Sequence, residues 1–197
     1  MAESTLAIVG LAFLVTCVAS LISLHLLNTG YRPVRDAVSY YARSRFGVLY
    51  IIQAVASGAA AGCLFVVIVE SFGVSRSLGL LALALYGLSR LVIPIFPADL
   101  PGEEQSSRGR MHVLFAGLAF IAIAVAAGPL TSVQVHDAGL LFATALRVAG
   151  LLTQVAAALL LVAIYLRPLR PVIGLVERFL YLGALSWMTL SLAHALR

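Results

Sequence analysis

The chain has 197 residues, of which 62% are hydrophobic and only 11% are charged, and its mean hydropathy is +1.06. Soluble domains carry about a quarter charged residues, so this composition excludes an ordinary water-soluble domain. The net charge is +5, and all 13 basic residues are arginines, spread over several connections and not gathered on one face. We therefore expect membrane lipids, and no nucleic acid, as partners of a single membrane domain that uses residues 1–197.

Six stretches of the sequence are long and apolar enough to cross a bilayer. A spanning helix needs roughly 20 apolar residues at about 1.5 Å of rise each. The stretches lie at about residues 6–27, 48–69, 78–96, 112–130, 140–166 and 172–196. The fold is therefore predicted to be all-α, a polytopic membrane protein built as a bundle of six transmembrane helices.

The first span is followed by a turn at residues 28–30, because a glycine after the last apolar residue favours a helix C-cap. Residues 34–45 are then predicted to form a short helix that lies in the membrane interface. Tyr40, Tyr41 and Phe46 would anchor it there, since aromatic side chains favour that depth.

The second span carries Ala54, Gly58 and Gly62 at four-residue spacing. Such a stripe of small residues lets another helix approach closely. We interpret it as helix packing, and the face of Gly58 and Gly62 could also contact another copy of the chain or another subunit.

Arg90 and Pro94 interrupt the third span, and Pro97 ends it. A polar connection at residues 100–110 leads to the fourth span, which we expect to end at residues 128–129.

Two polar residues, Arg147 and Gln154, lie within the long fifth span. Pro168 and Pro171 separate it from the sixth, because each proline lacks an N–H and clashes with the preceding turn.

The distribution of arginines predicts the orientation, since short cytoplasmic connections carry an excess of basic residues. The odd-numbered connections hold most of them, namely Arg32, Arg35, Arg43, Arg45, Arg108, Arg110, Arg167 and Arg170. The second connection holds only Arg76, and the fourth holds none. The odd-numbered connections are therefore predicted to be cytoplasmic, with both termini outside. The lack of lysine and the bias towards Ala, Leu, Val and Gly are typical of a GC-rich bacterial genome, so we expect a bacterial inner membrane.

When the six spans cross the membrane in alternating directions, several of their polar side chains lie at one depth near the cytoplasmic end. The predicted ligand-binding residues are Arg90, Asp99, His112, Glu177, His25 and Gln53. An ionisable side chain at bilayer depth is costly unless it is paired or hydrated, so Arg90 is expected to pair with Glu177 or Asp99. Such a pair could lock two helices or belong to a ligand site, and Arg90 could also snorkel to lipid headgroups.

A second polar site is expected towards the outer side, formed by Arg147, Gln154 and Glu70. Gln154 follows Arg147 on the same helix face, and Glu70 or Asp137 could reach Arg147 from the outer boundary. A latch between the second and fifth helices is favoured over an outward ligand site.

His25, Asp99 and His112 could together offer three metal ligands, and a haem between His25 and His112 is a further option. However, the sequence contains no H-x-x-x-H or H-E-x-x-H spacing, no G-x-S-x-G elbow and no phosphate-binding glycine loop. We therefore expect no metal and no cofactor, and we favour binding or transport over catalysis.

The connection after the first span and the end of the third span carry a family resemblance. The residues concerned are His25-Leu26-Leu27-Asn28-Thr29-Gly30-Tyr31, Pro33-Val34-Arg35-Asp36-Ala37-Val38-Ser39, Tyr41, Arg90, Phe96-Pro97-Ala98-Asp99 and His112. The chain resembles a bacterial integral-membrane family, domain of unknown function 998, which implies no particular activity. The Phe-Pro-x-Asp turn followed by a histidine resembles, more weakly, the autophagy-modulator (DRAM-type) six-helix membrane proteins, which are linked to lipid handling.

The leading hypothesis is a six-helix protein that binds or translocates a lipid or small amphiphile through a polar pocket near the cytoplasmic side, with Arg90 holding an anionic headgroup. One alternative is a membrane-embedded metal-dependent hydrolase that uses His25, Asp99 and His112. The other is a subunit or assembly partner of a larger membrane complex.

Overall fold

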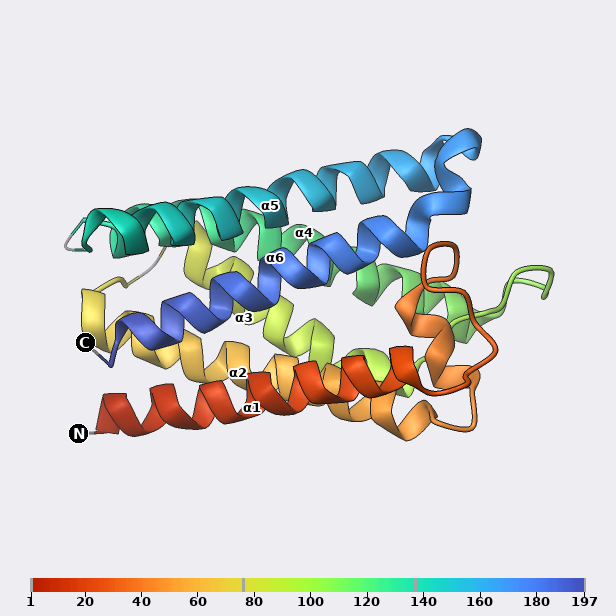
Figure 1. Cartoon of the computed structure of the whole chain (residues 1–197), viewed down its shortest axis with the longest axis horizontal. Helices are drawn as coiled ribbons and strands as arrows, with labels where there is room; N and C mark the ends of the chain where they lie inside the picture. Colours follow the sequence, from red (N-terminus) through yellow and green to blue (C-terminus); the bar gives the residue numbers. More distant parts are fainter. Residues whose placement is uncertain (1, 76, 137, 197) are drawn as a thin grey trace.

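The computed structural model describes residues 2–75, 77–136 and 138–196. Its long helices are α1 (Ala2–Leu26), α2 (Gly47–Phe72), α3 (Leu78–Val92), α4 (Ser107–Gln134), α5 (Leu140–Tyr165) and α6 (Ile173–His194), as Figure 1 shows. Short 3-10 helices η1 (Val38–Arg43), η2 (Ile93–Ile95) and η3 (Arg167–Val172) occur in or next to the connections. Among the described residues, six helical segments are long and apolar enough to cross a membrane, which confirms the predicted fold.

The helices form a bundle in which each packs against its neighbours in the sequence. Helix α6 also contacts α1, α2 and α4, so it connects the first and second halves of the chain. Both termini lie at the same end of the bundle, together with the α2–α3 and α4–α5 connections (Figure 1). The connections that carry most of the arginines lie at the opposite end, which we call the arginine-rich end.

Helix ends follow from local sequence signals. The hydroxyls of Ser77 and Ser106 accept hydrogen bonds from the backbone N–H groups of Leu80 and Gly109, so they N-cap α3 and α4. Gly73 ends α2 with a φ of 61°, a left-handed conformation that glycine adopts without a steric penalty.

Helix α4 differs from the predicted fourth span. It begins at Ser107 and continues through Pro129 to Gln134, whereas the sequence predicts an end at residues 128–129. Proline removes one N–H donor, but transmembrane helices tolerate it where neighbouring helices supply polar partners. The carbonyl that loses its donor is that of Val125; the side-chain amide of Gln154 on α5 donates to the neighbouring carbonyl, that of Ala124, at 3.3 Å.

The small-residue stripe of α2 packs inside the chain. A Cβ atom at Gly58 would lie 2.8 Å from the carbonyl oxygen of Gly87 on α3, so the two backbones approach closely there. This confirms the packing interpretation for Gly58 and leaves that residue no room to contact another chain. Gly62 is exposed with open space around it, so a contact with another chain stays a prediction for Gly62 alone.

The connection between α1 and α2 contains a 3-10 helix over Val38–Arg43, shorter than the helix predicted for residues 34–45. Its 3-10 helix η1 packs against α2 and α6, and Tyr41 is buried within the end of the bundle. A Cβ atom at Gly174, in the first turn of α6, would lie 2.6 Å from the carbonyl oxygen of Pro33 in this connection. The aromatic side chain of Tyr41 therefore stabilises the docking of this segment rather than anchoring it to lipid.

Candidate binding site

Arg90 is buried inside the bundle, near the C-terminal end of α3, with only 2% of its surface exposed. Its Nε–H donates to the hydroxyl of Ser57 at 2.8 Å, and one Nη2–H donates to Oε1 of Gln53 at 2.8 Å. An Nη1–H donates to the hydroxyl of Tyr181 on α6, at 3.1 Å. Ser57 and Gln53 are four residues apart on α2, so they present their side chains on one helix face.

The partners of Arg90 are all neutral. The only ion pair within 4.0 Å among residues 2–75, 77–136 and 138–196 joins Arg43 to Glu103, so the expected pairing of Arg90 with Glu177 or Asp99 is not formed. Hydroxyl and amide oxygens from two helices replace the carboxylate. A guanidinium has five N–H donors, and three of those of Arg90 are used within the protein, so two remain.

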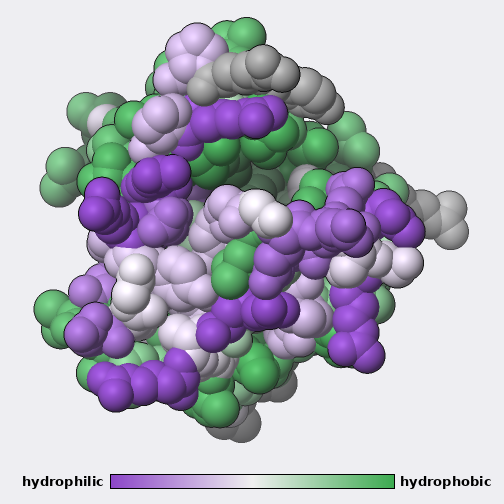
Figure 2. Space-filling view, turned by 90° about the vertical axis from the view of Figure 1, so that its right-hand side faces the viewer, coloured by the Kyte–Doolittle hydropathy of each residue, from purple (hydrophilic) through white to green (hydrophobic). Residues whose placement is uncertain are grey.

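Arg90 lines a cavity of about 550 Å³ at the arginine-rich end of the bundle. Figure 2 looks onto this end and shows hydrophilic residues around a hollow with hydrophobic residues inside it. The cavity wall comes from η1, the residues after η2, and α2 to α6. Four of the predicted ligand-binding residues line it, namely Arg90, Asp99, His112 and Glu177.

His112 is held in one orientation by the backbone. Its Nδ1 lies 2.7 Å from the carbonyl oxygen of Phe96. A carbonyl oxygen only accepts, so Nδ1 carries the proton. The ring is buried and lines the cavity, and Nε2 has no hydrogen-bond partner among the residues that the structure describes. Nε2 is therefore the nitrogen that a ligand in the cavity could meet.

Each carboxylate on the cavity wall has partners in the connections. Oε2 of Glu177 accepts from the backbone N–H of Val38 at 2.7 Å, and Glu103 pairs with Arg43 at 3.1 Å. Both oxygens of Asp99 accept hydrogen bonds from Ser106, one from its hydroxyl and one from its backbone N–H. These donors lower the pKa of Asp99 below its ordinary value. The carboxylates thus hold the connections in place, and Glu177 joins one of them to α6.

Two predicted site residues lie away from the cavity wall. Gln53 acts behind Arg90 as its hydrogen-bond acceptor and does not line the cavity. His25 faces Arg178 instead: its Nε2 accepts from the Nε–H of Arg178 at 2.6 Å, while its Nδ1 lies 2.6 Å from the carbonyl oxygen of Leu21. Arg178 also donates to the hydroxyl of Tyr41, so it ties α1 and the following connection to α6.

The structure does not bring His25, Asp99 and His112 together as metal ligands. Within the described part of the chain, no three His, Cys, Asp or Glu side chains are placed to hold a metal ion. Both ring nitrogens of His25 are already engaged, so this residue offers no lone pair to zinc or to haem iron.

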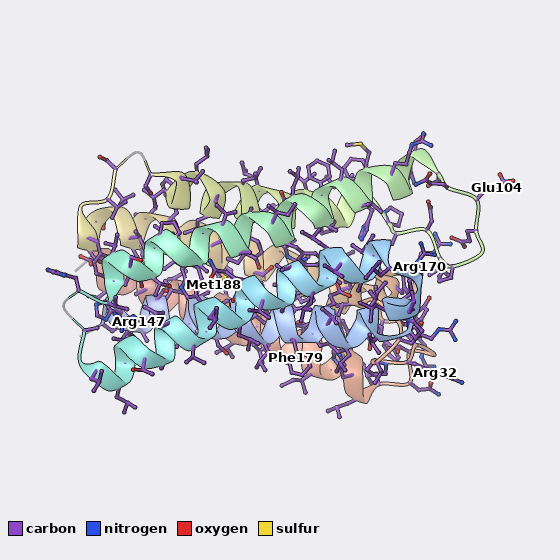
Figure 3. The ribbon with its side chains drawn as sticks, turned by 90° about the horizontal axis from the view of Figure 1, so that it is seen from above. Arg32, Glu104, Arg147, Arg170, Phe179 and Met188 are labelled. Carbon is purple, nitrogen blue, oxygen red and sulfur yellow. The ribbon has the colours of Figure 1, made fainter. Side chains whose placement is uncertain are left out.

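A second cavity, of about 610 Å³, lies towards the opposite end of the bundle. Arg147 and Gln154 line it, with Thr131, Ser132 and His136. Figure 3 shows Arg147 at the end of the molecule opposite to Arg32, Glu104 and Arg170. Glu70 is exposed, does not line this cavity and makes no ion pair with Arg147, so the predicted latch to Glu70 is not formed. Asp137 lies outside the described residues.

Sequence reasoning missed two of the three side chains that hold Arg90, and it missed the apolar half of the cavity. Tyr181 lies four residues after Glu177, and Ser57 lies four residues after Gln53. This spacing places each of them on the same helix face as a predicted site residue, and it was the signal that could have identified them. Most of the apolar lining comes from α4 and α5, including Phe120 and Leu160. No pattern in the sequence distinguishes such residues from ordinary membrane-facing ones.

Comparison with known proteins identifies one family. The model of the family described as "Protein of unknown function (DUF998)" matches residues 7–194, which confirms the resemblance to it. No curated protein and no solved structure matches the chain. The weaker resemblance to the DRAM-type proteins receives no support from these comparisons.

Proposed function

The chain belongs to the DUF998 family and is a multi-pass membrane protein, and we propose from its site that it binds an anionic lipid or small anionic amphiphile. The negatively charged headgroup would lie in the cavity at the arginine-rich end, against Arg90. Binding, without a chemical step, is the activity that this arrangement supports best.

The unused donors of Arg90 are the observation that carries the proposal. The guanidinium of Arg90 is buried and hydrogen-bonds only to neutral groups, so its positive charge has no carboxylate within ion-pair distance among the described residues. Two of its N–H donors remain after the bonds to Ser57, Gln53 and Tyr181. A phosphate or carboxylate group supplies the negative charge and the acceptor oxygens that such donors bind.

The remainder of the cavity supports an amphiphile over a small ion. Its volume of about 550 Å³ falls within the range of about 300–1,000 Å³ that is usual for small-molecule sites. Polar groups such as His112 and Tyr40 line one part, while aliphatic and aromatic side chains line another. With the sidedness predicted from the arginines, the ligand would come from the cytoplasmic leaflet.

Lipid retention measured by native mass spectrometry tests the proposal. Protein would be purified with equal amounts of phosphatidylglycerol and phosphatidylcholine, and the bound lipid would be compared between the wild type and Arg90→Gln. Glutamine keeps a hydrogen-bonding side chain but removes the charge. We expect the wild type to prefer phosphatidylglycerol and the variant to retain about tenfold less of it, a difference of about 1.4 kcal/mol.

Arg147→Gln is the matched control, because Arg147 also lines a cavity but lies at the other end of the bundle. It should retain phosphatidylglycerol as the wild type does. Equal retention by the wild type and Arg90→Gln, with both folded, would show that Arg90 does not hold the headgroup.

A further inference from the structure

One wall of the cavity is shared with the outer surface of the bundle. It is formed by α4 and α5, whose residues Val113, Ile121, Leu161 and Ile164 line the cavity. The same side chains are 65%, 46%, 38% and 46% exposed, respectively. These residues are accessible to solvent and line the cavity, which places an open side of the cavity along α4 and α5. In a membrane this exterior is lipid hydrocarbon, because the four residues lie within spanning segments.

Small residues of both helices lie on this wall of the cavity. Ala116 and Gly117 on α4, together with Ala157 on α5, line the cavity there. A Cβ atom at Gly117 would meet nothing within 4 Å. Other helical glycines behave differently: at Gly183 on α6, a Cβ atom would lie 2.7 Å from the backbone nitrogen of Thr153 on α5. Gly117 thus takes no part in a close helix contact, and the space beside it on the cavity wall is open.

This opening lies at the depth of the lipid acyl chains. Gly117 is ten residues into α4 from Ser107, a distance of about 15 Å along the helix axis. Ser107 marks the arginine-rich end of the spanning segment, so Gly117 lies at the level of the hydrocarbon of one leaflet. The polar residues Arg90 and His112 line the same cavity.

We infer that the opening between α4 and α5 is a lateral portal, through which a lipid from the surrounding leaflet places its headgroup in the cavity while its acyl chain lies past Gly117. This inference rests on the proposed function and specifies its ligand, a long-chain anionic lipid rather than a water-soluble anion. Charge and polarity decide the orientation of that lipid. The guanidinium of Arg90 attracts the headgroup, and the apolar edges of α4 and α5 contact the chain.

Gly117→Leu tests the portal, because it adds a bulky apolar side chain at a position where the Cβ atom would meet nothing within 4 Å. The matched control is Gly62→Leu on α2, another helical glycine whose Cβ atom would meet nothing within 4 Å. Each variant would be exposed to phosphatidylglycerol with long acyl chains and, separately, to dihexanoyl phosphatidylglycerol, and bound lipid would be counted by native mass spectrometry.

We expect Gly117→Leu to lose about tenfold of its affinity for the long-chain lipid and to bind the dihexanoyl lipid as the wild type does. Gly62→Leu should bind both lipids normally. Wild-type binding of the long-chain lipid by Gly117→Leu would overturn the portal, and so would an equal loss of both lipids. If the proposed function itself were wrong, a different result would show it: Arg90→Gln would bind phosphatidylglycerol as the wild type does.

Discussion

The chemistry of the site depends on a single buried arginine. A charge at bilayer depth is costly, and here three neutral oxygen atoms from α2 and α6 hold the guanidinium of Arg90. A carboxylate partner would neutralise the charge and turn the residue into a structural ion pair. Neutral partners keep its position, and in the proposed site its charge would meet the anionic headgroup.

Tyr181→Phe is expected to destabilise the protein by about 1 kcal/mol, because it removes the acceptor for Nη1 of Arg90 and leaves a buried donor unpaired. Unfolding in a graded series of detergent mixtures measures this difference. Tyr40→Phe is the control: Tyr40 also lines the cavity, but its hydroxyl makes no hydrogen bond among the described residues. An equal loss in the two variants would contradict the role given to the Tyr181 hydroxyl.

Asp99 should make the turn before α4 sensitive to acid. Its pKa is lower in the folded protein than in the unfolded chain, chiefly because of the hydrogen bonds from Ser106. The stabilisation is therefore present above the unfolded pKa, about 3.9, and is lost as the pH falls through the lower folded value. We predict that hydrogen-exchange protection of the Ser106 amide falls in that pH range. Asp99→Asn should abolish the pH dependence, and a wild-type profile that stays flat would refute the assignment.

At the scale of the elements, close backbone contact between α2 and α3 fixes the position of Arg90 relative to Ser57 and Gln53. Gly58→Ala places a Cβ atom 2.8 Å from the carbonyl oxygen of Gly87, so the two helices must separate. The expected cost is about 1–3 kcal/mol, as for other overpacked sites. Thermal unfolding of the purified variant measures it.

Gly62→Ala is the control for this contact, because its Cβ atom would meet nothing within 4 Å. Alanine is also the better helix former, so this variant should be as stable as the wild type or slightly more stable. If Gly62→Ala proved the more damaging of the two, Gly62 would contact another chain and the small-residue stripe would serve assembly.

The six spans could be predicted because length and hydropathy determine them. The convergence of Arg90, Asp99, His112 and Glu177 could be predicted because alternate helix ends meet at one side of a bundle. The pairing within this group could not, since it depends on helix rotation: α2 turns Gln53 and Ser57 towards Arg90, and η1 brings Val38 to Glu177. His25 was misplaced for the same reason, because Arg178 on α6 faces it.

At the scale of the whole molecule, the arginine-rich end is predicted to be cytoplasmic. Ser75→Cys and Glu104→Cys, both at exposed positions in connections at opposite ends of the bundle, test this in a background without Cys17 and Cys63. A membrane-impermeant maleimide should label Ser75→Cys in cells with only the outer membrane permeabilised. Glu104→Cys should react only after the inner membrane is opened, and the reverse pattern would invert the topology.

A density map of the protein purified with long-chain phosphatidylglycerol, at a resolution that shows lipid chains, would show directly whether Arg90 holds a lipid headgroup. We expect a phosphate group within hydrogen-bond distance of the Arg90 guanidinium and an acyl chain that leaves the cavity beside Gly117, between α4 and α5. A map in which ordered lipid covers the outer surface while the space beside Arg90 holds only water would contradict it.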